Sequence, residues 1–108
     1  MLFVTLEDFY AKADSCRRLT RQEEMECAAR MQSGEADARQ QLIDSYLPTL
    51  AAHVRRAPRH MQSLTLALYY LQTLEKCVDS FPFRQDGETF AHRLSWGLRQ
   101  ALVRYIAR

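Results

Sequence analysis

The chain has 108 residues and a formal net charge of +2, with 47% hydrophobic and 26% charged residues. These values are typical of a soluble globular chain, and the length suits one domain with one core. They exclude a low-complexity chain, and the longest apolar run, residues 64–71, falls far short of the length that a membrane span requires.

The charge is divided unevenly along the chain. Residues 1–50 contain six Lys or Arg and nine Asp or Glu, whereas residues 51–108 contain nine and four. From Thr89 to the end there are four arginines and no acidic residue. A basic end of this kind favours binding to a polyanion or to an acidic protein surface, and a solvated helix face is the alternative.

The apolar spacing is helical from the start of the chain. A first helix is expected from Leu6 to about Cys16, with Thr5 as its N-cap. Thr20 and Glu23 have the spacing of a capping box and open a second helix. This helix should end at Gly34, because glycine readily adopts the left-handed conformation of a C-cap.

A third helical segment is expected from about Ala36, with Leu42, Ile43, Tyr46 and Leu47 as its buried stripe. Proline fits the first turn of a helix but not its interior, so Pro48 indicates either a kink or a fresh start. The segment then continues as far as Pro58.

Two longer helices follow a short basic connection at 59–61. One covers Gln62 to Ser80, is ended by Phe81-Pro82-Phe83, and is followed by a turn at 84–87. The other runs from about Glu88 to Ala107. Its inward residues are predicted to be Phe90, Leu94, Leu98, Ala101, Leu102, Tyr105 and Ile106. No strand-like alternation occurs, so the sequence predicts an all-α fold, a single compact bundle of five or six helices.

No motif for catalysis or metal binding is present. There is no glycine-rich phosphate loop and no HExxH, and acidic residues near 23–26 are explained by the helix dipole. We therefore expect no enzyme activity, no cofactor and no metal. The cysteines are expected to be reduced and the histidines to be surface or hydrogen-bonded polar residues; these are Cys16, Cys27, Cys77, His53, His60 and His92.

The first residues, MLFVTLEDF, carry Glu7 and Asp8 and no basic run. They differ from a secretory signal, which begins with a basic region. A cytoplasmic protein is expected.

Three stretches occur in order between Leu19 and Arg108: LTRQEEMECAARMQSGEADARQQLIDSYLP, EKCVDSFPF and FAHRLSWGLRQALVRYIAR. In order and spacing they resemble region 2 of bacterial sigma factors of the sigma-70 family, in a divergent form. The resemblance implies a helical promoter-binding core over residues 19–108, preceded by a helix in residues 1–18. It also implies that helix 62–80 faces RNA polymerase and that helix 88–107 faces DNA.

The resemblance implies a function in transcription initiation, with promoter −10 DNA and the β′ subunit of core RNA polymerase as partners. Arginines neutralise phosphates, aromatic residues stack on unpaired bases, and a glutamine reads a base edge. The implied DNA-binding residues are Phe90, Arg93, Trp96, Arg99, Gln100 and Arg104. A tryptophan buried in the core is the alternative for Trp96. The implied polymerase- or partner-binding residues are Leu64, Thr65, Leu68, Tyr69, Gln72 and Glu75.

Several positions depart from the family pattern. Gly97 replaces the second of two tryptophans, Arg93 replaces a base-stacking tyrosine, and Val103 replaces a threonine that partners the glutamine. Leucine and tyrosine replace the acidic polymerase-facing residues of helix 62–80, which is apolar nearly all round. Such a helix is either buried under the first helix or paired with a regulatory protein or a second copy. A degenerate sigma-like adaptor or regulator that has lost autonomous promoter recognition is therefore the alternative function.

Overall fold

The computed structural model describes residues 3–84 and 87–108, and this part of the chain is all-α, as predicted. It contains six α-helices, a short 3-10 helix and no strand. The helices are α1 (Leu6–Ser15), α2 (Arg21–Gln32), α3 (Ala36–Ser45), α4 (Leu47–Arg56), α5 (Leu64–Ser80) and α6 (Phe90–Ala107), with the 3-10 turn at Arg59–Met61. Of the predicted turn at 84–87, residues 85–86 lie outside the described residues.

Local hydrogen bonds set most helix ends where the sequence predicts them. The Thr5 and Thr20 hydroxyl oxygens accept from the amides of Asp8 and Glu23, each at 3.1 Å, and both capping boxes are complete. Gly34 follows α2 with φ of 101°, the left-handed conformation that glycine tolerates. These predicted boundaries are confirmed because each depends only on residues close together in the chain.

Pro48 marks a fresh start rather than a kink within one helix. α3 ends at Ser45, and α4 begins at Leu47 with the proline in its first turn. The predicted starts of the two long helices were each two residues early. The Ser63 hydroxyl caps α5 by accepting from the Leu66 amide at 3.2 Å, and Thr89 caps α6 by accepting from His92 at the same distance.

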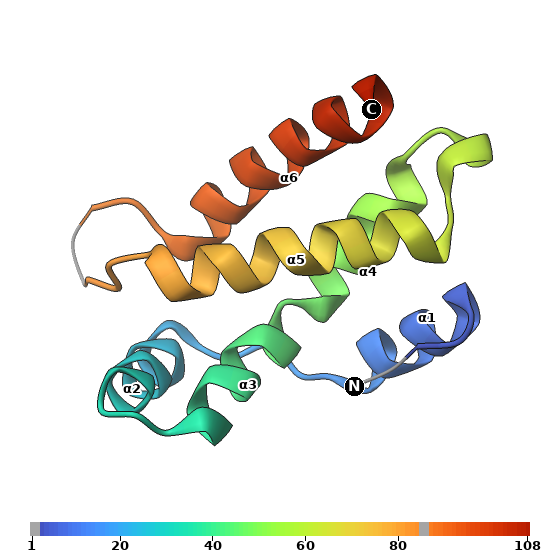
Figure 1. The fold of residues 1–108 in the computed structure, drawn as a ribbon. Coiled ribbons are helices and arrows are strands. Elements are labelled where there is room, and N and C mark those ends of the chain that lie inside the picture. Colours follow the sequence, from blue (N-terminus) through green and yellow to red (C-terminus); the bar gives the residue numbers. More distant parts are fainter. Residues whose placement is uncertain (1–2, 85–86) are drawn as a thin grey trace.

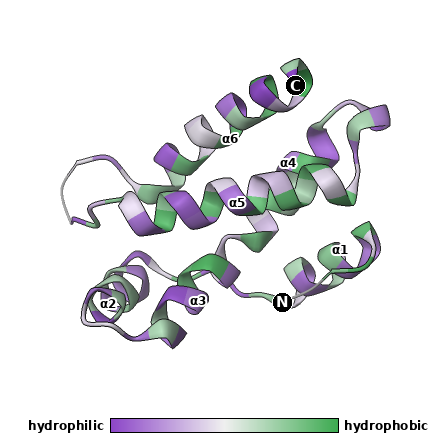
Figure 2. Ribbon diagram, viewed as in Figure 1, coloured by the Kyte–Doolittle hydropathy of each residue, from purple (hydrophilic) through white to green (hydrophobic). Residues whose placement is uncertain are grey.

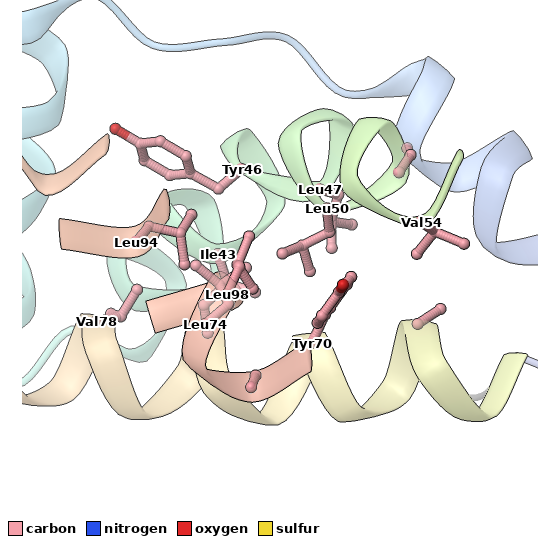
Figure 3. Close-up of a cluster of buried hydrophobic side chains, with 14 of the residues drawn as sticks. Ile43, Tyr46, Leu47, Leu50, Val54, Tyr70, Leu74, Val78, Leu94 and Leu98 are labelled. Carbon is pink, nitrogen blue, oxygen red and sulfur yellow. The ribbon is translucent and has the colours of Figure 1, made fainter. Parts of the chain in front are cut away.

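α5 lies at the centre of the molecule and contacts α1, α3, α4 and α6 (Figure 1). Its buried face packs into the main core together with the inner faces of α4 and α6 (Figure 3). The buried residues of α5 are Leu66, Ala67, Tyr70, Leu74 and Val78, and those of α6 are Phe90, Leu94, Leu98 and Ala101. Most apolar residues of α5 thus pack inside the domain, against several helices and not against α1 alone.

The predicted inward stripe of α6 was wrong at its end. Ile106 is 60% exposed, and Leu102 and Tyr105 are only partly buried. Each residue turns an α-helix by about 100°, so Ile106 lies well off the line through Leu94, Leu98 and Ala101. Figure 2 shows hydrophilic and hydrophobic residues alternating along α6. No helix within residues 3–84 and 87–108 has the length and apolar character that crossing a membrane requires.

Tyr46, at the junction of α3 and α4, joins distant parts of the fold. Its hydroxyl donates to Glu24 Oε2 at 2.6 Å, its ring lies 4.9 Å from the Phe90 ring, and the Arg18 guanidinium lies over its face. Burial, and then the bond to Glu24, raise the pKa of Tyr46. The hydroxyl therefore stays protonated and links α2 to the core.

We predict that Tyr46→Phe lowers the free energy of unfolding by about 1–3 kcal/mol, because the carboxylate of Glu24 loses a partly buried donor. Urea denaturation of both proteins measures the change. Tyr10→Phe is the matched control, since the Tyr10 ring touches Phe9 and Arg55 but no hydrogen bond to its hydroxyl is found within the described residues. Equal losses in the two variants would contradict the role given to the Glu24 bond.

Candidate nucleic-acid interface

The outer face of α6 presents five of the six predicted DNA-binding residues to solvent. Because the buried residues of α6 recur at a spacing of three or four, the positions between them point outward. Trp96 is 53% exposed, so it is a surface residue and not the core tryptophan that was the alternative. The other exposed members of the set are Arg93, Arg99, Gln100 and Arg104.

Phe90 is the exception. Its side chain is 1% exposed and its ring packs against Tyr46, Phe81 and Phe83, with centroid distances between 4.9 and 5.4 Å. It stands in the first turn of α6, where the chain returns towards the core after the Phe81–Phe83 segment. Phe90 is therefore a core residue in this structure, and the prediction that it contacts DNA is corrected.

Two grooves flank Trp96 along the contact between α5 and α6. One has a volume of about 340 Å³ and extends towards Tyr69, Gln72, Lys76, Gln100 and Arg104. The other, about 350 Å³, extends towards Phe81, Pro82 and Arg93. Both volumes lie in the range of pockets that bind small ligands. The grooves share Cys77, Ser80, Trp96 and Gly97.

Gly97 forms part of the floor of both grooves. A Cβ atom added there would lie 3.5 Å from Cys77 Sγ and from Thr73 Cγ2, which is ordinary contact distance. The missing side chain leaves the space beside Trp96 open. The small residue at position 97 is thus what keeps the grooves open next to the tryptophan.

The cations of this surface differ in their partners. Arg93 Nε donates to Glu88 Oε1 at 3.1 Å, and Arg93 Nη2 lies 3.0 Å from the same oxygen in an ion pair. Arg99 and Arg104 form no ion pair with any described residue, and neither does Lys76. Exposed, unpaired cations around an exposed aromatic ring are suited to bind an anionic ligand that also has a flat apolar face.

The predicted partner-binding residues of α5 are divided between two environments. Thr65, Leu68 and Gln72 are exposed, and Leu64, Tyr69 and Glu75 are partly buried. The Tyr69 ring contacts that of Tyr105 at 5.4 Å, and Tyr69 and Gln72 line the larger groove beside Trp96. The sequence analysis assigned Tyr69 and Gln72 to the polymerase surface and gave Lys76 no role. Lys76 follows Gln72 by one helical turn, and this spacing could have placed it on the same face.

A second depression, about 540 Å³, lies between α1, α2 and α3. Its lining includes Arg17 and Glu23, which form a two-bond ion pair at 3.0 and 3.1 Å, and Lys12 and Asp44, 3.9 Å apart. Its charges therefore largely neutralise one another. It does not offer the excess of positive charge that is found around Trp96.

No cluster of three or more metal-binding side chains occurs in residues 3–84 and 87–108. The three cysteines are free thiols. No protein-family model matches the chain.

We predict that Trp96→Ala changes the free energy of unfolding by less than about 1 kcal/mol, because the ring is half exposed and alanine favours a helix. Leu98→Ala, two residues further along and fully buried, should cost about 2–5 kcal/mol. Urea denaturation compares the two variants. A loss at Trp96 as large as that at Leu98 would mean that the ring belongs to the core.

Proposed function

We propose that this protein is a sigma-factor-like domain of bacterial transcription initiation, which binds single-stranded promoter −10 DNA and core RNA polymerase. The observation that carries the proposal is the exposed Trp96, with two grooves beside it along α5 and unpaired cations nearby. The resemblance of the sequence to sigma-factor region 2 supplies the biological setting. The all-α fold is compatible with that setting.

The chemistry of the surface favours single-stranded over double-stranded DNA. An unpaired base stacks on an exposed aromatic ring with about 1–3 kcal/mol, and this contact is not available to a base stacked within a duplex. Arg99 and Arg104 supply phosphate contacts, which weaken as salt rises. Gln100, exposed at the groove, adds a side chain able to bond a base edge.

We predict that the protein binds a single-stranded −10 oligonucleotide in a salt-dependent manner and that Trp96→Ala weakens binding roughly 5- to 100-fold. Arg99→Ala should also weaken binding and should lower the dependence on salt. Fluorescence anisotropy of a labelled oligonucleotide measures both. Val4→Ala is the control, since Val4 is 81% exposed and lies before α1, far along the chain from α6. Unchanged affinity in both test variants would refute the DNA-binding part of the proposal.

The polymerase part of the proposal rests on the outer stripe of α5. This stripe contains Thr65, Leu68, Gln72 and Lys76, all exposed. Leu68 is its one large apolar residue, 39% exposed. Replacing Leu68 with a smaller or a charged residue would therefore remove the apolar centre of a protein contact through α5.

We predict that the domain co-elutes with bacterial core RNA polymerase on size exclusion and that Leu68→Glu abolishes co-elution, because a carboxylate would be desolvated in the contact. Val4→Glu, which adds the same charge at another exposed apolar position, should leave co-elution intact. Circular dichroism checks that both variants fold. Separate elution of the wild type would remove the polymerase contact from the proposal.

The adaptor or regulator remains the second candidate. Val103 and Ile106, 63% and 60% exposed near the end of α6, favour it, because neither side chain can pair with a phosphate or a base edge. Elution of the wild type as a dimer that Leu68→Glu converts to a folded monomer would favour this second candidate over the first.

A further inference from the structure

α6 has a second cationic flank, which faces α4 and not the grooves beside α5. Trp96 lies at the crest of the exposed face, and the turn of the helix places Gln100 and Arg104 on one side of it and Arg99 on the other. Arg99 lies near enough to His53 of α4 for its positive charge to lower the pKa of that imidazole. The charge of a residue 46 positions further along the chain thus reaches the imidazole.

The contacts of His53 determine which of its ring nitrogens can accept a hydrogen bond or a proton. Nδ1 lies 2.9 Å from the Thr49 carbonyl oxygen, and only a protonated nitrogen can donate to that oxygen. The Arg56 guanidinium lies against the same ring, with Nη2 3.2 Å from Nδ1 and 3.5 Å from Nε2. With Nδ1 donating to the backbone, Nε2 of the neutral ring is left as the acceptor for Arg56.

The groups around His53 are otherwise cationic or aromatic. α4 contributes Arg56, α6 contributes Arg99, and α5 contributes Tyr70, whose ring meets the imidazole edge to face at 6.4 Å. Burial is the first cause that lowers the pKa of His53, and the charges of Arg56 and Arg99 lower it further. Neither arginine forms an ion pair with a described residue. Three basic side chains from two helices therefore gather without an acid among them.

We propose that His53, Arg56 and Arg99 form a phosphate-binding site, which holds a backbone phosphate of the strand whose base stacks on Trp96. This inference rests on the proposed function and adds a contact outside α6. Residues three apart on a helix are neighbours, so Trp96 and Arg99 can hold a base and a nearby phosphate of one strand. The strand then crosses α6 from the grooves of α5 to the end of α4.

A bound phosphate changes the net charge around His53 from positive towards neutral or negative. It accepts from both guanidinium groups, and protonation of His53 at Nε2 then adds a donor in place of an unfavourable third charge. Phosphate binding therefore favours the protonated imidazole and raises its pKa. Since the free protein holds that pKa below 6.5, binding takes up a proton and weakens as pH rises through this region.

The anion site is tested first without nucleic acid, with sulfate as the probe because it does not titrate in this range. The pKa of each histidine is measured by NMR in sulfate and in chloride at equal ionic strength, and His53→Gln assigns the signal. We expect sulfate to raise the pKa of His53. Arg56→Gln should abolish the shift, and Arg84→Gln, which removes an exposed arginine outside the cluster, should not.

Binding of a labelled single-stranded oligonucleotide is then measured against salt and pH. Arg56→Gln should lower the slope of log affinity against log salt by about 0.7, the value for one lost phosphate contact on a single strand. Arg84→Gln should keep the wild-type slope. His53→Gln should remove the weakening of binding that accompanies a rise in pH. Arg56 is exposed, and among the described residues its side chain hydrogen-bonds only with His53, so this variant should fold even if His53→Gln does not.

The outcomes separate this proposal from the function on which it rests. A sulfate shift together with a reduced salt slope supports the site as stated. A sulfate shift with an unchanged slope overturns the nucleic-acid assignment and leaves a site for free anions. An absent sulfate shift with an unchanged slope overturns the site, while loss of binding in Trp96→Ala would still support the proposed function. A wild type that binds no oligonucleotide overturns both the proposed function and the strand contact.

Discussion

α6 packs along α5 through a narrow apolar stripe, and this contact determines which side chains of α6 remain outside. Figure 3 shows Leu94 and Leu98 turned into the cluster that also holds Leu74 and Val78. Because a helix turns by about 100° per residue, burying this stripe forces Trp96 outward and places a flank of α6 on each side of it. The two grooves and the approach of Arg99 to His53 all follow from that one packing arrangement. A rotation of α6 by one residue would remove them together.

The pairing of charges differs between the two halves of the chain. In the N-terminal half, most cations have an acidic partner: Arg17 with Glu23, Arg30 with Glu35, Lys12 with Asp44, and Arg39 with Asp79 at 2.7 Å. The partner of Arg39 comes from α5, so this pair also ties α3 to the centre of the fold. Arg56, Arg99 and Arg104 have no acid among the described residues. Exposed ion pairs contribute little to stability, but their absence leaves a net positive potential that attracts a polyanion over a distance.

The apolar helix α5 now has a physical explanation that does not require a partner. Leu66, Tyr70 and Leu74 are buried in the core. The exposed stripe of α5 is polar apart from Leu68. The outer stripe of α5 therefore offers little apolar surface to a partner. Val103 and Ile106 lie on either side of Arg104 in the sequence and add exposed apolar side chains near the end of α6.

The sequence by itself determined the helical class, the caps at Thr5 and Thr20, the end of α2 before Gly34, and the outward position of most of the α6 arginines. These features depend on residues within one or two helical turns, where hydrogen-bond geometry and helical period leave little choice. Only the tertiary structure decided that Phe90 is buried, that Tyr69 and Gln72 line a groove beside Trp96, and that the charge of Arg99 reaches His53. The helical period predicts a buried stripe but not which neighbouring helix covers it or at what angle. That angle depends on the summed packing of distant side chains, which no local pattern encodes.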